Sequence, residues 1–220
     1  MTAAELNRTI QGIDVVPLRR NGPRGIVKAF VLYDQSSVVL VDTGFTAGDG
    51  ELLVPVLKER VTAATSFTAI VLTHGHGDHT GGLQRVRANF PWKVFAHAEE
   101  THNLAADSIE PDGFISGGER WDVLGGLRFT HMPGHTAGSM AVFHEASGSL
   151  IAGDAIVSAG QHLMISPEFL CEDPAQARES VTRLMGSGLD IKAVLVAHGE
   201  DVYRDAAAPL ARILLRSRPS

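Results

Sequence analysis

Short apolar runs of strand length alternate with polar turns along the first third of the chain. Runs 27–32 and 38–41 are rich in β-branched residues and flank the polar stretch 34–37, which predicts a β-hairpin. Run 69–72 is continuously apolar and predicts a buried strand. Between the second and third runs, residues 49–61 carry apolar side chains at helical spacing, and we expect a helix there.

The rest of the chain alternates between strands and helices. Turn residues at 125–126 and 147–148 predict two successive hairpins. The expected elements are helices at 82–90, 98–104, 174–185 and 206–216, and strands at 93–96, 120–123, 127–132, 140–144, 150–152 and 193–197. Such a chain packs best as two sheets face to face with helices outside, an α/β architecture. No linker-like stretch interrupts the pattern, so we predict one domain over residues 1–220.

The composition is that of a globular protein, with 44% hydrophobic and 20% charged residues, which excludes a disordered or collagen-like chain. The formal net charge is −6, so no global field attracts nucleic acid or an anionic membrane. We therefore expect a small-molecule substrate and neither a nucleic-acid nor a membrane partner. The pattern makes no prediction for the oligomeric state.

Three features bear on the cellular compartment. The single cysteine, Cys171, cannot form an intramolecular disulfide. Residues 1–8 lack the basic start and continuous apolar stretch of a secretory signal. The apolar runs are strand-sized and too short to cross a bilayer. Together these features predict a cytoplasmic protein.

The strongest chemical signal is the segment 73–82, Thr-His-Gly-His-Gly-Asp-His-Thr-Gly-Gly, which directly follows an apolar strand. His74 and His76 lie two positions apart, so an extended backbone directs both imidazoles to the same side. Asp78 and His79 follow at the expected helix start, where they can hold a second ion beside the first. Imidazole and carboxylate groups form a ligand set that suits zinc, iron or manganese.

Three further metal-competent side chains stand next to glycine at the ends of expected strands. They are His135 after 127–132, Asp154 after 150–152 and His198 after 193–197. A lone histidine in such a place is more often a packing residue than a ligand. Three such strand ends together with the histidine-rich segment predict a metal site.

This order of residues, HxHxDH followed by a His, an Asp and a last His, resembles the metallo-β-lactamase superfamily. The segments Val41-Asp42-Thr43-Gly44 and Met132-Pro133-Gly134-His135-Thr136-Ala137-Gly138-Ser139 extend the resemblance over nearly the whole chain. The resemblance implies a four-layer αββα sandwich with the metal centre at one edge. It also implies two divalent ions, with zinc expected first and iron or manganese as alternatives.

The resemblance further implies which side chains hold the ions. Each ion would take three side chains and both would share a carboxylate: His74, His76 and His135 for one ion, Asp78, His79 and His198 for the other, and Asp154 for both. Asp42 would orient a histidine ligand through a hydrogen bond.

Two divalent ions that lie close together lower the pKa of a water molecule bound between them. Hydroxide then forms near neutral pH and attacks a carbonyl carbon or phosphorus. Asp78 would accept the proton released by the attacking hydroxide. Asp154 would bridge the two ions throughout. The expected function is hydrolysis of a small ester, thioester or lactone.

The residues after Asp154 bear on the branch of the family. True β-lactamases lack a bridging aspartate at this place. Hydroxyacylglutathione hydrolases share all seven ligands but carry a Lys and a Tyr shortly after it, and neither occurs in segment 155–164 of this chain. Acyl-homoserine-lactone lactonases place a Tyr three residues after the bridging Asp, where this chain has Val157. The pattern therefore predicts a hydrolase without naming its substrate.

Two other activities stay open. Persulfide dioxygenases resemble this pattern but use a single iron, which His74, His135 and Asp154 would hold here. The loop after Asp154 lacks the Arg- and Cys-containing stretch associated with those enzymes. Nucleases of the tRNA-processing branch form the other class, and the acidic net charge argues against it.

Three residues are candidates for the substrate pocket. His162 and Met164 lie on the segment after Asp154, which often lines the pocket in this family. Phe45 directly follows the Asp-Thr-Gly motif. An imidazole at position 162 can also serve as a proton donor. The histidines outside the motifs are expected to be surface or packing residues: His97, His102, His131 and His144.

Overall fold

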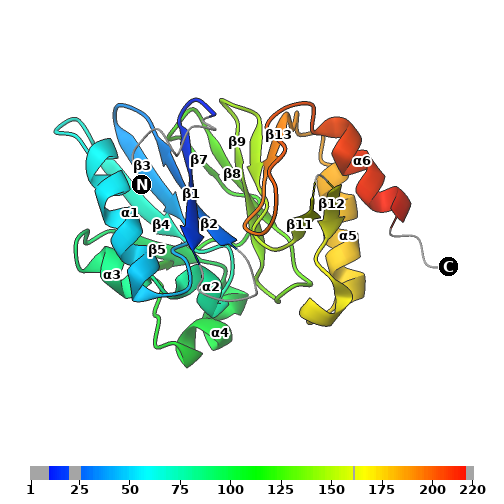
Figure 1. Ribbon diagram of the computed structural model, residues 1–220, viewed down its shortest axis with the longest axis horizontal. Coiled ribbons are helices and arrows are strands. Elements are labelled where there is room, and N and C mark those ends of the chain that lie inside the picture. Colours follow the sequence, from blue (N-terminus) through cyan, green and yellow to red (C-terminus); the bar gives the residue numbers. More distant parts are fainter. Residues whose placement is uncertain (1–9, 20–25, 161, 217–220) are drawn as a thin grey trace.

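The computed structural model describes residues 10–19, 26–160 and 162–216. The opening residues that were considered for a targeting signal lie outside these ranges. Within them, two larger sheets pack face to face (Figure 1), and a third sheet has only two strands. The first sheet has six strands in sequence order: β1 Ile13–Arg19, β2 Ile26–Tyr33, β3 Ser37–Val41, β4 Phe67–Val71, β5 Lys93–Ala96 and β6 Gly113–Phe114.

Strand directions change from antiparallel to parallel within this first sheet. β2 and β3 pair antiparallel with Tyr33 opposite Val38, which confirms the predicted hairpin. From β3 to β6 the strands run parallel, joined by crossovers that contain helices. The carboxyl ends of β3 and β4 therefore lie side by side, which brings Asp42 next to the segment that begins at Thr73.

The second sheet has five strands in the order β13-β10-β9-β8-β7. Both predicted hairpins are confirmed, because β7 pairs antiparallel with β8 and β9 with β10. The last strand, β13, lies parallel to β10 at the edge. The bounds are β7 Arg120–Trp121, β8 Leu127–His131, β9 Met140–His144, β10 Ser149–Ile151 and β13 Ala193–Leu195.

Helices cover the outer face of each sheet (Figure 1). The bounds are α1 Ala47–Arg60, α2 Gly77–Thr80, α3 Leu83–Arg87, η1 Ala98–Glu100, α4 Thr101–Ala106, η2 Glu168–Leu170, α5 Pro174–Met185 and α6 Ala207–Arg216. α1 begins before the expected Asp49 because Thr46 caps it in a capping box: Asp49 Oδ2 accepts the Thr46 N–H at 2.9 Å. None of the helices in the described part of the chain is long and apolar enough to span a membrane.

The apolar core has three layers. β3 shows how one strand serves two of them: Val38 and Leu40 face α1 and α3, whereas Val39 and Val41 face the second sheet. A third apolar layer fills the space between the second sheet and helices α5 and α6. Each sheet is thus buried on both faces, and the predicted αββα sandwich is confirmed.

Besides the two-residue strand β6, two strand pairs were not predicted. β1 contains Pro17 and a buried Asp14, which interrupt the apolar pattern; Pro17 is tolerated because β1 is an edge strand. Asp14 is satisfied by Arg60 of α1, whose Nε and Nη2 donate at 2.6 and 3.0 Å. The second missed pair is the hairpin of β11 Ile156–Ala159 and β12 His162–Ile165, a separate small sheet beside α5 and α6.

Candidate metal centre

The seven predicted ligands lie in four segments, each of which follows a strand. The segment from His74 to His79 follows β4, and α2 begins within it. The other three loops follow strands of the second sheet: His135 comes after β8, Asp154 after β10 and His198 after β13. The structure brings all seven side chains together at one edge of the sandwich.

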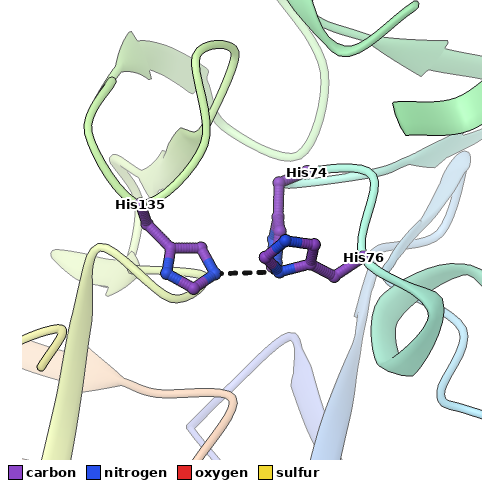
Figure 2. Close-up of side chains that lie close together, drawn as sticks. All are labelled: His74, His76 and His135. Atoms are coloured by element: carbon purple, nitrogen blue, oxygen red, sulfur yellow. Dashed lines mark hydrogen bonds between the residues drawn. The ribbon is translucent and has the colours of Figure 1, made fainter. Parts of the chain in front are cut away.

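Three histidines form the first group. His76 Nδ1 lies 3.1 Å from His74 Nε2 and 3.0 Å from His135 Nε2. Figure 2 shows the three imidazoles turned toward one another from two separate loops. Their ring nitrogens point at a common centre, so this group can hold a metal ion.

The second group contains Asp78, His79 and His198. His198 Nε2 lies 3.4 Å from Asp78 Oδ2. Asp154 lies between the two groups: its Oδ1 is 3.3 Å from His79 Nε2, and its Oδ2 is 3.6 Å from His135 Nε2 and 3.5 Å from His198 Nε2. This carboxylate therefore faces histidines of both groups.

Two buried polar atoms test whether a cation fits here. His79 Nε2 and Asp154 Oδ1 have no hydrogen-bond partner among the described residues, although they lie 3.3 Å apart. Buried nitrogen and oxygen atoms without partners are costly, and each unsatisfied one calls for an explanation. A divalent ion would satisfy both, and five imidazoles with two carboxylates are a suitable donor set for zinc, iron or manganese. The residues fit a metal centre.

Electrostatics keep two of the histidines neutral and both carboxylates ionised. Burial, with the neighbouring histidines, holds the pKa of His74 well below its ordinary value, and burial lowers the pKa of His135 to about 4. Both imidazoles are therefore neutral near pH 7. Burial acts to raise the pKa of Asp154, but the surrounding histidines, His79 first, outweigh it and lower that pKa. Likewise, His198 and His79 outweigh burial and lower the pKa of Asp78.

Asp42 is linked to the candidate centre through hydrogen bonds to His79 and Thr73. Its Oδ2 lies 2.8 Å from His79 Nδ1, and its two oxygens accept hydrogen bonds from the backbone N–H and the hydroxyl of Thr73, each at 2.8 Å. Asp42 has φ +61°, a left-handed conformation that aspartate tolerates better than most residues. The bond to Nδ1 leaves Nε2 of His79 to face Asp154, as the predicted orienting role requires.

Three supporting residues were missed by sequence reasoning. Thr73 contacts Asp42, and its hydroxyl lies 3.2 Å from His74 Nδ1. Ser166 Oγ lies 3.2 Å from His135 Nδ1. Glu100 reaches two ligand loops at once. Thr73 was visible as a neighbour of the histidine segment, whereas the other two stand in no motif and are found only from the fold.

The pocket candidates lie in two places. His162 and Met164 line a cavity of about 380 Å³ that also contains Ser166, the contact of His135. Phe45 lines a different cavity, of about 280 Å³, together with Gly77 and Thr80. The structure therefore brings His162 and Met164 together and places Phe45 beside the start of α2.

Comparison with known proteins agrees with this geometry. Residues 22–198 match the profile of the Metallo-beta-lactamase superfamily, and the chain belongs to this family. It is similar to the probable metallo-hydrolase YflN of Bacillus subtilis, with 25% identity over 74% of this chain and 75% of that protein. It is also similar to the hydroxyacylglutathione hydrolase of Alkalilimnicola ehrlichii, with 36% identity over 51% of this chain but only 41% of that enzyme.

Solved structures share the fold. The metallo-beta-lactamase DIM-1 superposes with a TM-score of 0.75 over 94% of both chains, at 21% identity. The B3 metallo-beta-lactamase BLEG-1 gives a TM-score of 0.68 over 88% of this chain and 96% of its own, at 23% identity. At these identities the likeness establishes the fold, and the chemistry has to be argued from the site.

Proposed function

We propose that this chain is a dinuclear metal-dependent hydrolase of a small ester, thioester or lactone. The observation that carries the proposal is the position of Asp154, whose carboxylate faces histidines of both ligand groups at 3.3 to 3.6 Å. A carboxylate so placed suits two ions better than one. The relatives that are named hydrolases support the same class of reaction.

The ligands would divide between the ions as the family resemblance implies: His74, His76 and His135 would hold one, Asp78, His79 and His198 the other, and Asp154 both. Two divalent ions, zinc in the first instance, would supply hydroxide near neutral pH and positive charge for the oxygen or sulfur that leaves as an anion.

Side chains of the protein would accept the proton, offset the charge of the ions and bind the substrate. Asp78 is half-buried and ionised, and its place in the second ligand group makes it our candidate for the group that accepts a proton at the reacting centre. Asp154 is buried and ionised, and its negative charge offsets the repulsion between two cations. His162 and Met164 line the cavity that shares Ser166 with the centre, and this cavity is our candidate for the acyl or leaving-group pocket.

The test begins with metal analysis of protein purified without added metal. We expect about two zinc-like ions per chain, and Asp154→Ala should lose metal as well as activity. One iron per chain in the wild type would contradict the proposal and favour an oxygenase.

A substrate panel then separates the hydrolase classes. Thioesters, lactones, phosphodiesters and a chromogenic β-lactam should be compared at equal protein concentration. Turnover of thioesters or lactones is expected. Turnover of phosphodiesters alone would contradict the proposed substrate class.

A further inference from the structure

Glu100, the last residue of η1, is a fully buried carboxylate without an ion-pair partner in the described part of the chain. Four hydrogen-bond donors surround it instead. Oε2 accepts from the backbone N–H of Gly75 at 2.7 Å and from Asn103 Nδ2 at 3.1 Å. Oε1 accepts from the backbone N–H of Gly138 at 2.8 Å and from the hydroxyl of Thr136.

Three of these donors belong to the two loops that supply the three-histidine group, and the fourth, Asn103, lies in α4. Gly75 lies between His74 and His76, and Thr136 directly follows His135. We propose that Glu100 is a positioning residue: its carboxylate ties the two loops together and sets the distance between their histidines. This inference rests on the proposed metal centre and adds a residue to it that touches no ion.

Close packing around the carboxylate supports this role. A Cβ on Gly75 would lie 2.8 Å from Glu100 Oε2 and 2.6 Å from Asn103 Cβ. On the other side, a Cβ on Gly138 would lie 2.8 Å from Glu100 Cγ. Both loops therefore approach Glu100 as closely as glycine allows, and their separation is fixed by the width of one carboxyl group.

A carboxylate is required because both of its sides receive a backbone N–H. In Glu100→Gln, the amide NH₂ must replace one oxygen, so it faces the N–H of either Gly75 or Gly138. Two donors cannot bond each other, and one loop loses its anchor. The variant keeps the size of the side chain, and it removes the negative charge together with the ability to hold both loops.

The experiment measures zinc binding by metal-free protein in competition with a chromogenic chelator. We expect wild type to bind two ions and Glu100→Gln to bind one of them roughly 10–100-fold more weakly, the usual range for residues that orient ligands. Two control variants should keep wild-type affinities: Glu99→Gln removes a neighbouring exposed charge, and Asp14→Asn removes a buried carboxylate that bonds Arg60.

Combined variants locate the weakened ion. If Glu100 acts through the three-histidine group, adding Glu100→Gln to His76→Ala, which already disables that group, should weaken zinc binding no further. Adding His198→Ala should remove the second ion as well. The reverse pattern would overturn the inference.

The outcomes separate this inference from the proposed function. Wild type that binds no divalent ion would contradict the metal centre itself. Wild type with two ions and a Glu100→Gln variant of equal affinity would overturn only the role of Glu100. If Glu100→Gln does not fold, Thr136→Val replaces it, since it removes one donor to Oε1, and unchanged zinc affinity in that variant would overturn the inference.

Discussion

The carboxylate of Asp42 and the imidazole of His79 meet with Oδ2 and Nδ1 2.8 Å apart, and both side chains are fully buried. Thr43, which follows Asp42, holds the backbone of His79. Its N–H and its hydroxyl both donate to the carbonyl oxygen of His79, at 2.7 and 2.9 Å. The imidazole ring and the backbone of His79 are therefore both held by two consecutive residues, Asp42 and Thr43. His79 cannot turn its Nε2 away from the centre without breaking these bonds.

Replacing Asp42 with Asn should weaken metal binding by roughly 10–100-fold. Asn tolerates the left-handed backbone of this position, so the effect isolates the lost carboxylate. Chelator competition gives the affinity. Thr46→Ala is the matched control: it removes a helix cap, should cost about 0.5–2 kcal/mol of unfolding free energy, and should leave metal affinity unchanged. An Asp42→Asn variant with wild-type affinity would exclude the orienting role.

Removal of metal should destabilise the protein as well as inactivate it. The ligands come from both sheets, so an ion bound only by the folded chain raises its stability by about 2.7 kcal/mol at a free concentration 100-fold above Kd. Thermal unfolding of metal-free protein, with and without added zinc, measures the shift in Tm. Asp154→Ala should show a smaller shift than wild type. Equal Tm with and without zinc in the wild type would argue against the centre.

The leaving group should control the rate. Val157 cannot donate a proton, and a thiolate, with a pKa of about 8.5 for a cysteine-like thiol, departs without one more readily than an alkoxide. We therefore expect a higher kcat/KM for a thioester than for its matched oxygen ester. If His162 supplies a proton, His162→Ala should lose the oxygen ester selectively. Met164→Ala, in the same cavity, should slow both esters alike. Equal wild-type rates on the two esters would refute the expectation.

The Lys28–Asp201 pair should matter for stability. Lys28 Nζ donates to Asp201 Oδ1 at 2.6 Å and to the carbonyl of Gly199 at 2.8 Å, and both charged side chains are almost fully buried. Asp201→Asn leaves the ammonium unpaired and should cost about 3–5 kcal/mol near pH 7. Urea unfolding measures the loss. Asp190→Asn, which removes the exposed partner of Lys192, should change stability by less than about 0.5 kcal/mol.

The loss in Asp201→Asn should shrink at alkaline pH. Burial lowers the pKa of Lys28, whereas Asp201 opposes that shift. A lysine with a lower pKa in the folded state than in the unfolded state makes the unfolded chain bind more protons, so stability rises with pH between the two values. Without Asp201 the folded pKa falls further, and the rise begins at lower pH. A loss that is the same at pH 7 and at about pH 9.5, below the unfolded lysine pKa of about 10.4, would contradict this account.

The sequence predicted those parts of the fold that local pattern determines. The hairpin of β2 and β3 and helix α5 were found because apolar spacing and turn residues agree there. β1 was missed because two of its residues break the apolar pattern. Asp14 is compatible with the strand because Arg60 bonds it, and Pro17 is compatible because β1 lies at the edge of the sheet. Neither the contact with Arg60 nor the edge position can be predicted from neighbouring positions in the sequence.

The same distinction applies to the site. His74 and its neighbours form a dense local motif, so the centre could be predicted before the fold was known. Glu100 and Ser166 act across loops that are distant in sequence, and each looks like an ordinary polar residue in its own segment. The roles of such residues become visible only when the tertiary contacts are known.

The chain position of His198 has a consequence for how the protein is made. Val27 of β2 bridges to His198, and Lys28 bonds the carbonyl of Gly199 across 171 residues of sequence. A contact of such separation cannot form before both of its partners have been synthesised, and non-local contacts of this kind slow folding. Almost the whole described chain must therefore have left the ribosome before His198, the last of the proposed ligands, reaches its place. The metal should therefore bind after synthesis, and only to chains whose two sheets have already packed against each other.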